Sequence, residues 1–193
     1  MCLKKLGWLY FAKYLIGNMS SYVSTYWKEE LVKRIRGKSL VLVLADSNLP
    51  ERYSMDIIEL CSGVTGTHLF RMQGGEQIKT HKHLIRIYNE LDRVGADRNS
   101  LLICLGGGTI SDLGGFAAST YKRGIDLVIL PTTVVGIVDA AIGGKNGINV
   151  SSEVGILKNQ IGTFYQPSLV GINLQWLDSL PHDEVKSGWG EML

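Results

Sequence analysis

Short apolar segments alternate with longer amphipathic segments along most of the chain. The apolar segments are rich in β-forming residues and lie at 39–46, 67–72, 100–106, 126–131 and 168–173. Several are apolar throughout, which is typical of parallel strands that are covered on both faces. Helical periodicity fills the intervening segments, at 20–36, 51–62, 77–94 and 110–121. This alternation predicts an α/β fold with a doubly wound, mostly parallel sheet.

The first residues of the chain resemble a secretion signal only superficially. An apolar run in residues 1–19 is interrupted by Lys13, and no small-residue cleavage site follows it. No apolar run approaches the 18 residues that suggest a membrane span, so we expect no membrane association. We interpret this end as a structured or tag-like lead-in.

The last residues have the chemistry of a helix start. Ser179 is a candidate cap, Pro181 suits a first turn, and Asp183 and Glu184 favour the positive end of the helix dipole. No stop signal follows before Leu193. We therefore expect this helix to lead into a further helical domain that the 193 residues lack. The expected division is a lead-in with a first helix (1–38), an α/β domain (39–178) and the start of the following helix (179–193).

Composition narrows the classes of function. The 193 residues are 45% hydrophobic and carry a net charge of +2, which suits one domain, or at most two small ones, with a real core. No basic cluster with interleaved aromatic residues suggests nucleic-acid binding, so a small-molecule ligand is expected. Cys2, Cys61 and Cys104 are odd in number and far apart, which indicates neither disulfides nor a thiolate zinc site and fits a reducing cytoplasm.

The glycine-rich segment "LGGGTISDLGG" (105–115) joins a predicted strand to a predicted helix. Glycines at such a junction let a phosphate approach the helix N-terminus. The segment fails the GxGxxG fingerprint, because Ser111 stands at the third glycine position, and no acidic residue ends the next strand. It is also no Walker loop, since "GGK" (143–145) is followed by Asn146. Alone, it fits a tight turn as well as a ligand site.

Polar residues recur near the ends of the apolar strands. "PTT" (131–133) ends one strand, where its threonines fit either a ligand or, as the simpler alternative, a helix cap. Further polar pairs follow elsewhere: Glu76 with Lys79, Asp139 with Lys145, and Lys158 with Asn159. Single charges are usually solvated surface, but the carboxyl ends of parallel strands share one sheet edge. The pattern therefore favours a site for a polar, anionic ligand.

Seven spaced motifs together resemble the 3-dehydroquinate synthase family. They are "GEQ-x-K", "GGG-x-x-x-D", "Y-x-RG", "PTT", "VDA-x-x-GGK", "KN-x-IG-x-FYQP" and the terminal "GEM", in this order from about residue 74. The resemblance implies a Rossmann-like NAD-binding domain that a C-terminal metal-binding helical domain follows in the family. It also implies a cytoplasmic homodimer.

The resemblance implies a lyase of the shikimate pathway of aromatic amino acid biosynthesis. The family converts 3-deoxy-D-arabino-heptulosonate 7-phosphate into 3-dehydroquinate and phosphate. NAD transiently oxidises an alcohol, which acidifies the neighbouring proton before phosphate leaves, and the ketone is then reduced again. A divalent metal, zinc or cobalt, polarises the substrate oxygens in the family.

The resemblance also implies a role for each matching residue. Arg123 would bind the substrate phosphate, and Asp139, Lys145 and Asn159 would bind the hydroxyls and carboxylate of the substrate. Glu191 matches a metal ligand. The residues that would contact NAD are Asp46, Gly75, Glu76, Gln77, Lys79, Gly107, Gly108, Thr109, Ile110, Ser111, Asp112, Thr132, Thr133, Lys145, Lys158, Trp176, Leu177, Asp178 and Ser179.

The chain departs from the family pattern in three respects. Gly74 stands where many members have Asp, and the segment between Lys145 and Lys158 is longer than usual. The two histidine metal ligands of the family have no counterpart here. The histidines that are present, His68, His81, His83 and His182, are better explained as ordinary surface or capped residues. One carboxylate does not hold zinc tightly, because catalytic zinc sites use three protein ligands.

Two alternatives to an NAD-binding synthase domain stay open. One is another sugar-phosphate cyclase with a different product, and the other is a non-catalytic nucleotide-binding module. We expect this 193-residue chain to bind NAD and to be inactive alone.

Overall fold

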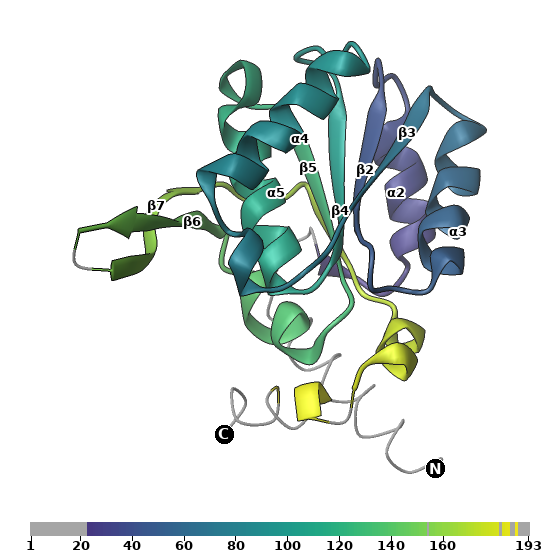
Figure 1. The fold of residues 1–193 in the computed structure, drawn as a ribbon. Helices are drawn as coiled ribbons and strands as arrows, with labels where there is room; N and C mark the ends of the chain where they lie inside the picture. Colours follow the sequence, from purple (N-terminus) through teal and green to yellow (C-terminus); the bar gives the residue numbers. More distant parts are fainter. Residues whose placement is uncertain (1–22, 154, 182, 186–187, 189–193) are drawn as a thin grey trace.

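The computed structural model describes residues 23–153, 155–181, 183–185 and 188. Its centre is a six-stranded, entirely parallel sheet with the strand order β1-β8-β5-β4-β2-β3 (Figure 1). The strands are β1 (Val23–Ser24), β2 (Val41–Asp46), β3 (Thr67–Met72), β4 (Leu101–Gly106), β5 (Asp126–Pro131) and β8 (Leu169–Gly171). The predicted parallel α/β sheet is confirmed.

Helices cover both faces of the sheet. α4 (His81–Arg93) and α5 (Gly108–Thr120) cover one face, and α2 (Trp27–Ile35) and α3 (Glu51–Ser62) cover the other (Figure 1). Alternating strand residues explain this division, because Leu42 and Leu44 join the apolar core beneath α4 and α5, whereas neighbouring strand residues join the core beneath α2 and α3. All residues of β4 are buried, as expected for a central parallel strand.

Short helices and a hairpin complete the fold. The short helices are η1 (Glu76–Ile78), η2 (Tyr121–Arg123), the π-helical η3 (Gly136–Ala140) and η4 (Leu174–Ser179). β6 (Lys145–Ser152) and β7 (Gly155–Phe164) form an antiparallel hairpin that projects from the side of the molecule (Figure 1). Among the described residues, no helix is both long and apolar enough to cross a membrane.

Two predicted helix starts are wrong. The predicted helix at 20–36 begins only at Trp27, because Val23 and Ser24 extend and pair with β8. The predicted helix at 77–94 is divided between η1 and α4. Thr80 causes the division, since its backbone is extended and its hydroxyl accepts a hydrogen bond from the His83 N–H.

The predicted helix start at Ser179 is also wrong. Ser179 is the last residue of η4, and its hydroxyl donates to the Trp176 carbonyl at 3.0 Å. Helical structure resumes at residues 183–185, where the Val185 N–H donates to the Pro181 carbonyl. The hydroxyl expected to cap the next helix instead closes the preceding short one.

The packing of α5 on β4 gives a test of the core. An added Cβ at Gly114, in the middle of α5, would overlap the Cys104 Sγ. We expect Gly114→Ala to lower the free energy of unfolding by roughly 1–3 kcal/mol through overpacking, measured by urea denaturation. Gly63→Ala, at the end of α3 with no atom within 4 Å of the added Cβ, is the control. Equal stability of the two variants would contradict this packing.

Candidate functional site

The topology of the sheet creates a crevice at the carboxyl ends of β2 and β4. The chain runs from β2 outwards to β3, returns to β4, and then continues in the opposite direction to β5. Open α/β sheets bind ligands at such a switch point, outside the carboxyl ends of the strands. Asp46 ends β2 on one side of this crevice, and the glycine loop after β4 lies on the other.

The glycine loop presents an uncapped helix N-terminus to this crevice. Gly107 is the N-cap of α5 and provides no side-chain cap. The N–H groups in the first turn of a helix have no acceptors within the helix, so they are available to an anion. Close packing explains the glycines, because an added Cβ at Gly106 would lie 2.8 Å from the Ile110 side chain and one at Gly107 2.9 Å from Thr133 Cγ2.

The two threonines after β5 form hydrogen bonds with other residues of the protein. The Thr132 N–H donates to the Gly106 carbonyl at 2.9 Å, and Thr132 is only 2% exposed. The Thr133 hydroxyl accepts a hydrogen bond from the Gly136 N–H at 3.0 Å, next to the start of η3. This is the simpler alternative that the sequence offered, a threonine cap, although the Thr133 hydroxyl retains a proton to donate.

Lys79 is the buried centre of a polar network beside the glycine loop. It is 3% exposed, and its ammonium donates to Asp112 Oδ2 at 2.7 Å and to Asn159 Oδ1 at 2.5 Å. Asp112 comes from the second turn of α5, and Asn159 from β7. The ammonium therefore joins three segments that are far apart in the sequence.

Asn149 extends this network to η1. Its side-chain amide donates to Glu76 Oε1 at 2.7 Å, its N–H donates to the Lys79 carbonyl at 2.7 Å, and its Oδ1 accepts from the Asn159 N–H at 3.0 Å. Asn159 has a φ of 53°, a left-handed conformation that asparagine tolerates better than most residues. These bonds fix the hairpin against the α/β body.

Burial raises the pKa of the Asp112 carboxyl above its ordinary value. The hydrogen bond and charge of Lys79 lower this pKa, whereas the negative charges of Glu76 and Asp139 raise it further. The net shift is upwards, so burial outweighs the ion pair at this carboxyl. Asp112 is thus a carboxyl whose ionised form depends on the Lys79 ammonium.

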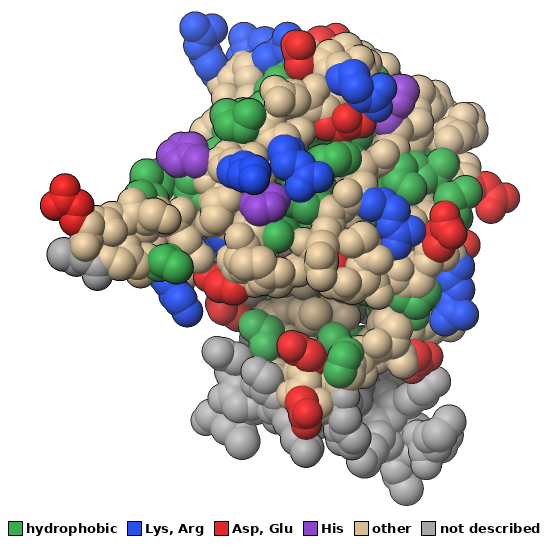
Figure 2. Space-filling view, in the orientation of Figure 1, with side chains coloured by type: hydrophobic (Ala, Val, Ile, Leu, Met, Phe, Trp, Pro, Cys, Tyr) green, Lys and Arg blue, Asp and Glu red, His purple; other side chains and the backbone are tan. Residues whose placement is uncertain are grey.

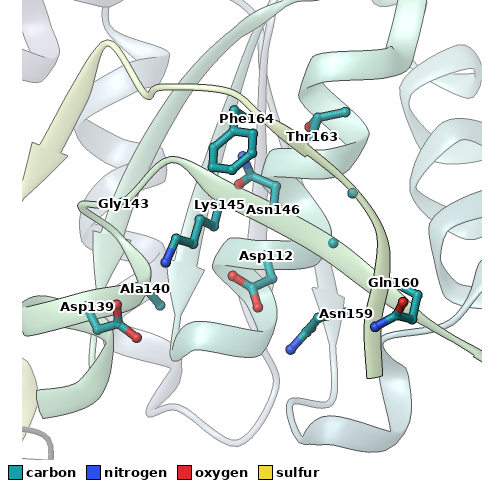
Figure 3. Close-up of a pocket in the computed structure, with 12 residues that line it drawn as sticks. Asp112, Asp139, Ala140, Gly143, Lys145, Asn146, Asn159, Gln160, Thr163 and Phe164 are labelled. Carbon is teal, nitrogen blue, oxygen red and sulfur yellow. The ribbon is translucent and has the colours of Figure 1, made fainter. Parts of the chain in front are cut away.

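A cavity of about 430 Å³ opens between α5, η3 and the hairpin. Asp139, Lys145 and Asn159 line it together with Asp112, and the Lys145 side chain points towards the space between the two carboxylates (Figure 3). This volume lies within the usual range for small-molecule sites. The structure thus brings together three of the four residues expected to bind substrate.

Other predicted residues lie away from this cavity. Arg123 is exposed at the end of η2, with a φ of 68°, and Lys158 is exposed on β7; neither lines the cavity. The Trp176 side chain is 2% exposed and packs at 5.0 Å from the Trp27 ring in the core. Leu177, Asp178 and Ser179 follow it in η4.

The remaining predicted cofactor residues lie in the loop that follows β3. Gly75 has a φ of 116°, which glycine alone adopts readily, and η1 begins at Glu76. The Gln77 side chain turns back and donates to the Gly74 carbonyl at 3.1 Å. On α5, Thr109, Ile110 and Ser111 occupy the first turn behind Gly108.

The hairpin contributes cavity residues that the sequence did not reveal. The sequence pattern predicts no element between 131 and 168, where the structure has η3, β6 and β7. Asn146 and Asn149 are 7% and 8% exposed, so part of the buried side of β6 is polar and lacks the alternation of a half-buried strand. Gln160 and Thr163 also line the cavity and carried no earlier signal, whereas Phe164, which lines it too, stands in the motif "KN-x-IG-x-FYQP" but was given no role.

The described residues do not form a metal site. No group of three or more His, Cys, Asp or Glu side chains is suitably placed among them. Glu191, the predicted metal ligand, lies outside the described residues. Basic and histidine side chains gather over α4 (Figure 2), and burial together with Arg86 and Lys82 lowers the pKa of His83. The positive charges of Arg86 and Lys82 near the His83 imidazole disfavour the binding of a metal cation there.

Sheet, switch point and glycine loop together define a nucleotide-binding α/β domain of the NAD-binding type. The family model for the N-terminal part of 3-dehydroquinate synthase matches residues 69–187. The chain therefore belongs to the 3-dehydroquinate synthase family.

One relative is the 3-dehydroquinate synthase of Parabacteroides distasonis, which is 40% identical over 153 residues, 79% of this chain and 42% of the relative. The chain therefore spans well under half the length of that relative. A crystal structure of 2-deoxy-scyllo-inosose synthase with carbaglucose-6-phosphate, NAD⁺ and Co²⁺ has a TM-score of 0.78 at 26% identity, covering 89% of this chain and 47% of that one. The structure of the 2-epi-5-epi-valiolone synthase of Streptomyces hygroscopicus subsp. jinggangensis 5008, with NAD⁺ and Zn²⁺ bound, has a TM-score of 0.77 at 27% identity. The match covers 91% of this chain and 49% of that one.

Removing the charge of Asp112 tests the buried network. The Lys79 side chain is more deeply buried than that of Asp112, at 4% against 22% exposure, so an unpaired ammonium should dominate the loss. We expect Asp112→Asn to lower the free energy of unfolding by roughly 2–3 kcal/mol, at or below the range for fully buried pairs. Glu90→Gln, which removes the pair with the 66%-exposed Arg93, should cost less than about 1 kcal/mol. Urea denaturation that ranks the two variants in reverse would refute this role for Lys79.

Proposed function

We propose that this chain is the NAD-binding part of a 3-dehydroquinate synthase, a lyase that converts 3-deoxy-D-arabino-heptulosonate 7-phosphate into 3-dehydroquinate and phosphate. One observation carries the proposal: the uncapped N-terminus of α5 adjoins a polar cavity lined by Asp139, Lys145 and Asn159. A dinucleotide and a polyhydroxylated substrate can thus lie side by side. The family membership names the reaction.

The glycine loop supports the cofactor part of this proposal. The pyrophosphate would receive hydrogen bonds from the N–H groups at Gly107, Gly108 and Thr109 and gain from the positive end of the α5 dipole. Thr133 and Lys158 would complete the cleft, and for Trp176 only its backbone is suited to contact NAD, because its side chain is buried. When bound, NAD supplies the hydride acceptor.

The cavity supports the substrate part. Lys145 would bind the substrate carboxylate or a hydroxyl through its ammonium, while Asp139 and Asn159 would accept or donate hydrogen bonds to hydroxyls. A mixed acidic and basic lining suits a sugar acid better than an apolar molecule. The same lining also suits the substrates of other sugar-phosphate cyclases.

A divalent metal belongs to this proposal only for a longer protein. The two structural relatives were solved with Co²⁺ and Zn²⁺, but the described residues offer no group of three metal ligands. We expect the chain alone to bind NAD and to release no measurable phosphate from the substrate.

We also expect the protein to work in the reducing cytoplasm. Cys61 and Cys104 are free and buried, and burial raises the pKa of the Cys61 thiol to about 11. The pKa of Cys104 is raised as well. Thiols of this kind are largely protonated and poorly reactive at neutral pH.

A carboxylate placed in the glycine loop tests the cofactor proposal. An added Cβ at Gly108 would lie 3.2 Å from Ala140 Cβ, so a side chain fits there with only a small adjustment. We expect Gly108→Asp to weaken NAD binding by more than roughly tenfold, because a negative charge would face the pyrophosphate. Gly108→Ala adds bulk without charge, so it should weaken NAD binding much less.

Calorimetric titration of the purified chain with NAD measures both variants. Failure of the unaltered chain to bind NAD would overturn the proposal. A parallel assay of phosphate release tests the expected inactivity of the chain alone, which release from 3-deoxy-D-arabino-heptulosonate 7-phosphate would contradict. Release from a different sugar phosphate, and none from 3-deoxy-D-arabino-heptulosonate 7-phosphate, would favour another cyclase.

The expected homodimer has a candidate contact surface on β7. Each residue of this strand is exposed apart from Thr163, which is intermediate, and Ile156 and Phe164 are 71% and 86% exposed. In the described part of the chain, β6 and β7 form a sheet by themselves, so the outer edge of β7 has no partner strand. Two copies could pair these edges antiparallel about a two-fold axis.

An acidic residue on this edge tests the contact surface. We expect Ile156→Glu to shift the chain from dimer towards monomer in sedimentation velocity, because the charge would be buried between the copies. Met55→Glu, at a 49%-exposed position on α3, is the matched control and should leave the dimer intact. A dimer that survives Ile156→Glu would place the interface elsewhere.

A further inference from the structure

The hairpin of β6 and β7 is irregular at Asn149. The register between the two strands is interrupted between Ile148 and Val150, so Asn149 alone faces the segment 158–160 of β7. Irregularities of this kind redirect side chains out of the regular ladder and occur often beside active sites. Here the irregularity lies where β7 presents Asn159 to the cavity. The side chain that it redirects is that of Asn149.

Asn149 holds three other residues through three of its polar groups. Its side-chain amide donates to Glu76 Oε1 at 2.7 Å, and its Oδ1 accepts from the Asn159 N–H at 3.0 Å. Its own N–H donates to the Lys79 carbonyl at 2.7 Å. Asn149 is 8% exposed and is not one of the residues that line the cavity. It can therefore influence a ligand only through the residues that it holds.

The backbone of Asn159 depends on this contact. Its φ of 53° is unfavourable for a residue with a side chain, and such a conformation persists only where the surroundings enforce it. The segment 158–160 is exposed, so apolar packing does not enforce it. Hydrogen bonds do, from the Asn159 N–H to Asn149 and from the Lys79 ammonium to Asn159 Oδ1.

The Glu76 carboxylate depends on Asn149 in a similar way. Glu76 is exposed at the start of η1, where a long side chain has many accessible rotamers. The bond from the Asn149 amide selects one of them. Glu76 is one of the expected cofactor residues, and Asn159 is one of the expected substrate residues. A single side-chain amide thus joins the two sets.

We propose that Asn149 is a positioning residue, which holds Glu76 on the cofactor side and the left-handed Asn159 on the substrate side as one rigid unit. This inference rests on the proposed NAD-binding function. Without Asn149, the Glu76 side chain and the hairpin would have to become ordered when the ligand binds. That ordering costs binding free energy, although Asn149 itself touches no ligand.

Two substitutions at Asn149 separate positioning from a general loss of stability. Asn149→Ala removes both side-chain bonds, so we expect it to weaken NAD binding by roughly tenfold over the whole pH range. Asn149→Asp keeps an acceptor for the Asn159 N–H but places a second carboxyl against Glu76. Two carboxyls at hydrogen-bond distance retain one shared proton to a higher pH than a single carboxyl does. While that proton is present it bridges the pair, and once it is lost the two charges repel each other.

NAD binding by Asn149→Asp should therefore be close to that of the unaltered chain at about pH 5 and roughly tenfold weaker at about pH 8. Burial raises the pKa of Asp112 in the unaltered chain as well, so each affinity is compared with that of the unaltered chain at the same pH. Calorimetric titration with NAD measures the affinities, and urea midpoints establish that each variant is folded.

Two further variants identify the origin of the pH dependence. Glu76→Ala, combined with Asn149→Asp, removes one carboxyl of the pair, so the added pH dependence should disappear whatever the affinity itself becomes. Asn89→Asp adds the same charge at an exposed position on α4 and is the matched control. Its NAD affinity should follow that of the unaltered chain at both pH values.

The outcomes separate this inference from the function on which it rests. If the unaltered chain does not bind NAD, both proposals fail. If the Asn149 variants lower the urea midpoint but leave the NAD affinity of the folded chain unchanged, NAD binding stands and the positioning role is overturned. An equal loss of affinity in Asn149→Asp at both pH values would also overturn it, because Glu76 would not be the partner. A loss that appears only at the higher pH and disappears with Glu76→Ala is the expected result.

Discussion

The ammonium of Lys79 is the interaction on which the candidate site depends. Burying an unpaired lysine costs free energy of folding. Here Asp112 of α5 and Asn159 of β7 both accept hydrogen bonds from the Lys79 ammonium. Together with the bonds of Asn149 to Glu76 and to the Lys79 carbonyl, this contact holds the hairpin, which forms one wall of the cavity. The ion pair therefore does more than stabilise the fold, because it sets the distance between the glycine-loop helix and the substrate residues on β6 and β7. A dinucleotide phosphate arriving at the N-terminus of α5 would meet this network at Asp112.

Hydrophobic patterning was sufficient to predict the central sheet and failed where burial is polar. The segments 100–106 and 126–131 were predicted as buried strands and are β4 and β5, since residues covered on both faces must be apolar. The hydrophobic pattern did not predict β6, because Asn146 and Asn149 are buried through hydrogen bonds rather than through apolar packing. The bonds from Asn149 to Glu76 and from Asn146 to the Tyr165 carbonyl join residues far apart in the sequence, and no local pattern encodes them.

The candidate site was predictable to the extent that sheet topology determines it. Residues at the carboxyl ends of strands had to meet, and the family resemblance pointed to Asp139, Lys145 and Asn159, which line one cavity. Exposure and side-chain direction were not predictable. Trp176 illustrates the limit, because a residue in a matching segment turned its ring into the core against Trp27. Arg123 illustrates another, since it was expected to bind substrate but does not line the cavity.

The failed dinucleotide fingerprint has a physical explanation in the order of the strands. The fingerprint assumes that the strand carrying the acid follows the glycine loop, whereas a ligand responds only to which strands are neighbours in space. In this sheet β2 and β4 are neighbours, so the acid at the end of β2 stands beside the loop although it comes some sixty residues earlier, at position 46 against 106. The next strand also contributes to the position of this carboxylate, because the Gly74 N–H, just beyond the end of β3, donates to Asp46 Oδ1 at 2.9 Å.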